Sequence, residues 1–97
     1  MMMTDSAFPD FSGKVILLYL INRSPDDAVV LHSARFETQG ARTFLVGEYA
    51  EGTTANDWAA EVTTAVSWDC VEQYLIFDSI EDYFNRASLA YNKESVH

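Results

Sequence analysis

The chain has few of the features that point to a secreted or membrane protein. It contains a single cysteine, Cys70, among 97 residues, so no disulfide can form within the chain. Small secreted domains usually depend on several disulfides, and one thiol therefore favours a reducing compartment, with the cytoplasm as the expected location. The longest apolar run, residues 15–21, is far shorter than the ~20 residues of a membrane-spanning helix. The first residues lack the basic and apolar regions of a secretory signal, so neither export nor membrane insertion is expected.

Basic residues are scarce. Six Lys and Arg stand against 15 Asp and Glu, which gives a formal net charge of −9. Residues 1–45 carry 5 acids and 4 bases, whereas residues 46–97 carry 10 acids and 2 bases. Phosphates repel such a surface, so direct binding to nucleic acid or to an anionic membrane is not expected. The acidic second half serves solubility in the simplest interpretation, and attraction of a basic protein partner is the alternative.

The residue types that carry catalysis are also few. Of two histidines, His97 is the last residue, and His32 lies alone in a strand-like segment, where a structural role is the usual one. Asp69 and Glu72 flank Cys70, and negative neighbours disfavour a reactive thiolate, so Cys70 is interpreted as a small buried hydrophobe. No catalytic residue is therefore assigned.

Metal-binding and nucleotide-binding motifs are missing from the sequence. It has no Cys-x-x-Cys, no His-Glu-x-x-His and no calcium-loop pattern. Its four glycines are dispersed and match neither nucleotide fingerprint: Gly13, Gly40, Gly47 and Gly52. We therefore expect no metal and no cofactor.

The sequence contains enough apolar residues to form one hydrophobic core. Hydrophobic residues make up 48% of the chain and aromatic residues 13%, which predicts a globular domain. We place this domain at residues 13–92, with a flexible lead-in over 1–12 and a frayed tail over 93–97. Within the lead-in, Phe8 and Phe11 are available to pack against the domain.

Five segments have the composition or alternation of strands: 14–21, 28–38, 42–49, 62–68 and 71–77. The first is apolar without alternation and is expected to be the central strand. In the second, Leu31 and Phe36 lie five residues apart and so on opposite faces of a regular strand. A β-bulge near Ser33 would bring both to the core.

A helix is predicted at the end of the chain. Ser79 and Asp82 have the spacing of a capping box, with the shorter Asp in place of the usual Glu. Apolar residues then recur at helical spacing and form one stripe, which must lie on the sheet or on another subunit. The stripe consists of Ile80, Tyr83, Phe84, Ala87, Ala90 and Tyr91.

Together these elements predict an α+β fold that is mainly β. About five short antiparallel strands should curve into a small barrel or half-barrel, with one C-terminal helix against it. The general form resembles the SH3-like small barrels. The comparison concerns architecture alone, because no family motif accompanies it and fold does not imply function.

Two places stand out as candidate binding residues. The loop stretch Asn56-Asp57-Trp58 combines a long loop with a large aromatic side chain, and Asn56 could cap a short turn there. The alternative is that Trp58 folds back and plugs one end of the core. Arg42 is the second candidate, and an internal ion pair with a carboxylate is the favoured explanation for it.

Three functional hypotheses follow. The first is a cytoplasmic, non-catalytic interaction or regulatory module that self-associates through an edge strand or through the aromatic helix face with Tyr83 and Tyr91. The second is an acidic inhibitor or mimic that binds a basic protein partner. The third is a small-ligand pocket inside the barrel. Its lining would be Trp68, Tyr74 and Tyr49, with His32 or Glu48 as the polar group.

Overall fold

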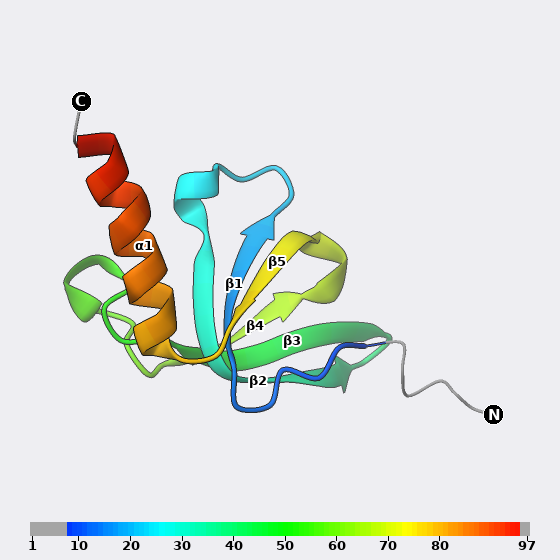
Figure 1. Ribbon diagram of the computed structural model, residues 1–97. Coiled ribbons are helices and arrows are strands. Elements are labelled where there is room, and N and C mark those ends of the chain that lie inside the picture. Colours follow the sequence, from blue (N-terminus) through cyan, green and yellow to red (C-terminus); the bar gives the residue numbers. More distant parts are fainter. Residues whose placement is uncertain (1–7, 96–97) are drawn as a thin grey trace.

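The computed structural model describes the backbone of residues 8–95 and the side chains as far as Leu89. Five strands form one antiparallel sheet, and a single long helix follows them (Figure 1). The elements are β1 (Val15–Leu20), β2 (Val29–Gln39), β3 (Arg42–Tyr49), β4 (Thr63–Ser67), β5 (Val71–Phe77) and α1 (Ile80–Ser95). The mainly β fold with one C-terminal helix predicted from the sequence is confirmed.

The strand order in the sheet is β4-β3-β2-β1-β5. Each neighbouring pair is antiparallel, and within the described residues β4 and β5 form no ladder with each other. The sheet is therefore curved but not closed, so the SH3-like barrel is only a rough comparison. The middle position belongs to β2 rather than to β1, although β1 is an inner strand with a partner on each side.

A β-bulge interrupts the pairing of β2 with β3. The pairing of β2 with β3 shifts register between His32 and Arg35, and Ser33 between them has a positive φ of 56°. The extra residue returns Leu31 and Phe36 to the same face, where both belong to the main core. The bulge predicted near Ser33 is confirmed.

The concave side of the sheet holds the main core. Its fully buried side chains are Phe11, Ile16, Leu18, Leu31 and Leu45. Phe11 is only 2% exposed, so the packed part of the chain begins before Gly13. The rings of Trp68 and Tyr74 contact Phe11, with centroid distances of 6.5 and 5.2 Å. Aromatic rings thus fill this side of the sheet.

Short helical turns lie in the connections from β1 to β2 and from β4 to β5. The turn η2 (Pro25–Asp27) begins at Ser24, whose hydroxyl accepts a hydrogen bond from the Asp26 amide. The turn η4 (Trp68–Cys70) joins β4 to β5. Cys70 is partly exposed there instead of buried, and its carbonyl accepts a hydrogen bond from the Ile21 amide.

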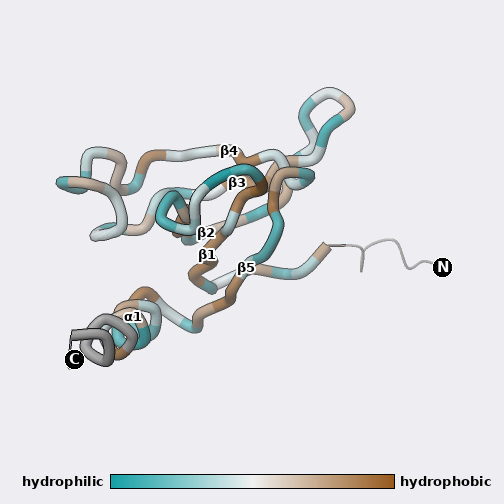
Figure 2. The backbone as a smooth tube through the Cα atoms, turned by 90° about the horizontal axis from the view of Figure 1, so that it is seen from above, coloured by the Kyte–Doolittle hydropathy of each residue, from teal (hydrophilic) through white to brown (hydrophobic). Residues whose placement is uncertain are grey.

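The convex side of the sheet carries a second cluster, and α1 docks on it by its first turns. Val15, Leu17 and Val30 form this cluster with Ala50, and Ile80 and Tyr83 of the helix pack against it. Further along the helix the contact ends, because α1 runs away from the sheet (Figures 1 and 2). Of the predicted apolar stripe, Ile80 and Tyr83 are covered and Ala87 is exposed, while the side chains of Ala90 and Tyr91 lie outside the described residues.

The cap predicted for this helix is present with one change. The Ser79 hydroxyl accepts a hydrogen bond from the Asp82 amide at 3.0 Å, as expected for an N-cap. The Asp82 carboxylate reaches back to the amide of Asp78 at 3.3 Å, one residue before the cap. The helix continues to Ser95 and includes part of the segment expected to fray. Within the described residues, no helix combines the length and apolar character needed to cross a membrane.

Candidate interaction site

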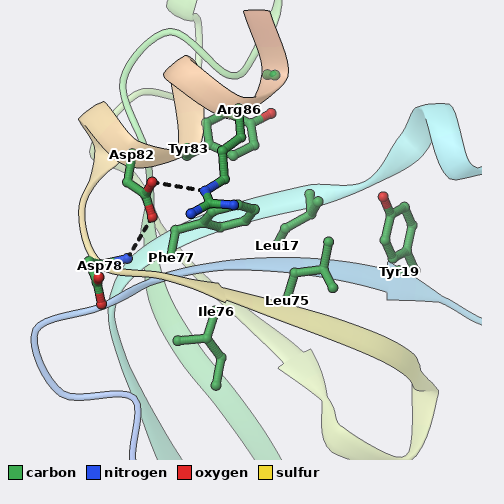
Figure 3. Close-up of a pocket in the computed structure, with 10 residues that line it drawn as sticks. Leu17, Tyr19, Leu75, Ile76, Phe77, Asp78, Asp82, Tyr83 and Arg86 are labelled. Atoms are coloured by element: carbon green, nitrogen blue, oxygen red, sulfur yellow. Dashed lines mark hydrogen bonds and ion pairs between the residues drawn. The ribbon is translucent and has the colours of Figure 1, made fainter. Parts of the chain in front are cut away.

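A groove lies between β5 and the start of α1. Its volume is about 800 Å³, and its lining combines apolar and aromatic side chains with the charged groups of Asp78, Asp82 and Arg86 (Figure 3). Leu17 and Tyr19 of β1 contribute to it, together with residues from β5 and the first two turns of the helix. The β5 and helix residues are Leu75, Ile76, Phe77, Asp78, Asp82, Tyr83, Arg86 and Ala87.

The groove borders the free edge of the sheet. Within residues 8–95, β5 pairs with β1 on one side only, so the other side of β5 presents main-chain N–H and C=O groups without a ladder. Leu75 and Ile76 point to opposite sides of β5 and are 38% and 49% exposed (Figure 3). Monomeric proteins usually protect such an edge with Lys, Pro or inward charges. The segment 71–77 has none of these and carries one charge, on Glu72.

Polar groups mark the rim where β5 meets α1. Arg86 donates a hydrogen bond from Nε to the Asp82 carboxylate at 3.0 Å. This bond and the bond from the Asp78 amide hold the pKa of Asp82 below its ordinary value. At the groove wall, burial raises the pKa of the Tyr83 phenol above its ordinary value. The Lys14 ammonium pairs with Asp78 at 2.8 Å and so ties β1 to the end of β5.

We expect the Asp82 contacts to make the helix start sensitive to acid. Because the folded-state pKa of Asp82 is lowered, its stabilisation is present above the unfolded value of about 3.9 and is lost as the pH falls through the folded value. Asp82→Asn should therefore be less stable than the wild type at neutral pH. The gap between their denaturation midpoints should narrow as the pH falls below about 4. A gap that stays constant with pH would show that the carboxylate does not contribute through its charge.

A second surface is formed by the loop between β3 and β4. Trp58 is 78% exposed, so it does not plug the core. The turn η3 (Ala55–Asp57) begins at Thr54, not at Asn56, and Asn56 itself has a positive φ of 55° inside the turn. Asp57 accepts a hydrogen bond from the Gly52 amide, which closes the loop on itself. The structure thus places the Asn56-Asp57-Trp58 stretch at the surface.

Arg42 lies at the other end of the molecule from this loop. It begins β3, whereas the loop follows the last residue of β3, Tyr49. Its guanidinium donates to the Ser67 hydroxyl at 2.8 Å and lies 5.5 Å from the centroid of the Phe44 ring. The favoured internal ion pair is absent among the described ion pairs, and a hydroxyl and an aromatic face take its place. The two sequence candidates, Arg42 and Trp58, therefore do not form one site.

His32 connects the sheet to the same loop. Its Nε2 atom is 2.8 Å from the Glu61 carboxylate, and its Nδ1 atom is 3.0 Å from the Ser33 hydroxyl. A hollow of about 270 Å³ lies beside His32 and Glu61, with Val15, Ala50, Glu51 and Ile80 as its other walls. Both Ser33 and Glu61 have positive φ, at 56° and 64°. The contact fastens the loop to the bulge, which is a structural role.

The other residues assigned to a barrel pocket are engaged elsewhere. Trp68 and Tyr74 pack on each other at 5.7 Å between ring centroids, and Tyr49 packs on the same core. Glu48 accepts a hydrogen bond from Thr63 and lies 3.5 Å from Arg35. Trp68, Tyr74 and Tyr49 thus contribute to the packing of the main core.

Of the two tyrosines assigned to an interface, only Tyr83 has a described side chain. Tyr83 stacks edge-to-face on Phe77, at 5.3 Å between ring centroids, and so belongs in part to the fold. The side chain of Tyr91 lies outside the described residues. Leu75 and Ile76, the exposed residues of the groove edge, were missed because the segment 71–77 predicts a strand but does not show that this strand lies at the edge of the sheet. Two adjacent large apolar residues in an outermost strand are the signal, since one of them must face away from the core.

Comparisons with known proteins give no information on function, so a function can be proposed only from the geometry of the structure. No protein-family model matches the chain, and searches of curated proteins and of solved structures give no match. Within the described residues, no group of three or more His, Cys, Asp or Glu side chains is placed to hold a metal ion.

Proposed function

We propose that the protein is a non-catalytic interaction module of the cytoplasm, and that it self-associates through the β5 edge and the groove beside it. The observation that carries the proposal is the exposed pair Leu75 and Ile76 on a strand edge that lacks protective charges. An edge of this kind is a template for pairing with another strand.

A second copy of the chain is the occupant that fits best. Two β5 strands related by a twofold axis run antiparallel, which is the arrangement of every other pair in this sheet. Each copy then supplies the same apolar side chains, and one charge per strand, on Glu72, faces water at the end of the contact. The opposite edge, β4, is shorter and presents Thr63 and Ala65, so it offers less apolar area.

The unpartnered part of α1 supports the same assembly. Leu89 is 69% exposed and Phe84 is partly exposed, so the helix keeps an apolar surface after it leaves the sheet. In a dimer that pairs through β5, the groove walls of both copies lie beside the contact between the two strands. One interface then covers the strand edge and part of the helix face together.

The test is the mass of the protein in solution after a charge is placed on the edge. Ile76→Lys should shift the sedimentation coefficient to that of a monomer, because a buried lysine at a strand joint is costly and charged edges prevent pairing. Circular dichroism should show that the sheet is retained, since Ile76 is half exposed.

Ile21→Lys is the matched control. Ile21 is exposed to a similar degree but lies in the turn after β1, away from the groove. This variant should sediment as the wild type does. A wild type that is already monomeric at high concentration, or an equal effect of the two lysines, would contradict the proposal.

A further inference from the structure

The loop that carries Trp58 has properties that self-association through β5 does not use. Trp58 is the most exposed large apolar side chain among the described residues. The groove lining does not include it, and the loop enters the sheet at the end of β3, not at β5. This loop therefore forms a surface that is separate from the groove.

The loop is held in place at several points. Ala59, next to Trp58, is buried at 1% exposure and anchors the chain. Its amide donates to the Thr54 hydroxyl, and the Thr53 hydroxyl donates to the Ala50 carbonyl at 2.6 Å. Gly52 lies against the ring of Phe84, so the loop also contacts α1. Trp58 is thus presented by a loop that is already ordered, which reduces the entropy cost of binding.

The sequence on both sides of Trp58 is acidic. Between Arg42 and Arg86 the sequence has nine acidic residues and no Lys or Arg. Three of these acids belong to the loop: Glu51, Asp57 and Glu61. Asp57 is fixed by the Gly52 amide and Glu61 by His32, so two carboxylates have defined positions on the same loop as the indole.

We infer that the Trp58 loop is a binding site for an arginine- or lysine-bearing segment of another protein. A guanidinium or ammonium group is attracted to the face of an indole ring, and Trp is the strongest of the aromatic residues in this contact. Neighbouring carboxylates bind the same cations and repel acidic segments, which gives selectivity by charge. The exposed ring and the fixed carboxylates therefore select the same kind of partner.

The experiment uses a short synthetic peptide of alternating arginine and glycine, titrated against the full chain and followed by isothermal calorimetry. We expect the wild type to bind it, and Trp58→Ala to weaken binding about tenfold. The same peptide with citrulline in place of arginine should not bind, because it keeps the shape and loses the charge. Sedimentation of Trp58→Ala should equal that of the wild type, so this test does not depend on the β5 interface.

A matched acidic control separates the site from general attraction. Asp69→Asn removes one charge from the same half of the chain but in the turn between β4 and β5. It should change the affinity only slightly, whereas Asp57→Asn should lower it clearly. No binding by the wild type would overturn the inference, and so would equal binding by the wild type and Trp58→Ala.

Discussion

Replacing Phe11 with alanine is expected to lower the free energy of unfolding by about 3–5 kcal/mol. The ring is 2% exposed and lies in the main core, in contact with Phe36, Trp68 and Tyr74. Its removal leaves a cavity that the surrounding strands cannot close, because their positions are fixed by the ladder. Denaturation in urea or guanidinium measures the loss.

Phe8 provides the matched control for Phe11. It stacks on Phe36 at 4.8 Å between ring centroids but is 40% exposed. Phe8→Ala should cost about 1 kcal/mol, because only a surface aromatic contact is lost. If Phe11→Ala also cost only about 1 kcal/mol, the segment before Gly13 would not be part of the core.

Replacing Tyr83 with alanine is expected to cost about 2 kcal/mol and to loosen the start of α1. Tyr83 fills the space between the helix and the convex cluster, and its ring packs on Phe77. Hydrogen exchange along the helix should rise, and denaturation should show the lost stability.

Leu89 is the control for the helix docking. It lies on the part of α1 that has left the sheet and is 69% exposed. Leu89→Ala should change stability by no more than about 0.5 kcal/mol in the monomer. If Leu89→Ala cost as much as Tyr83→Ala, the helix would be packed along its length and the groove would not be open.

The parts of the fold that were predictable are those fixed by local sequence. The bulge at Ser33 followed from two core residues spaced five apart, because only an extra residue can return both to one face. The helix start followed from Ser79 and Asp82, since capping needs only neighbouring residues. Both are short-range rules that the surrounding fold does not change.

The parts that were not predictable depend on contacts between distant residues. The hydrogen bond between His32 and Glu61 joins residues 29 positions apart, and no local pattern encodes it. The direction of α1 is another case, because an apolar stripe requires a cover but does not specify which surface provides it. For the candidate site, the sequence indicated Trp58 as a binding residue but did not decide whether its side chain is exposed. The positive φ values at Asn56 and Asp57 shape this loop, and no strong local signal in the sequence predicts them.

The most direct test of self-association at β5 is hydrogen exchange of the β5 main-chain amides at high and low protein concentration. The amides that face away from β1 should exchange slowly at high concentration and rapidly after dilution, because the second copy protects them only while it is bound. The amides of inner strand β2 should not change. Outward-facing β5 amides that exchange rapidly at every concentration would contradict the account.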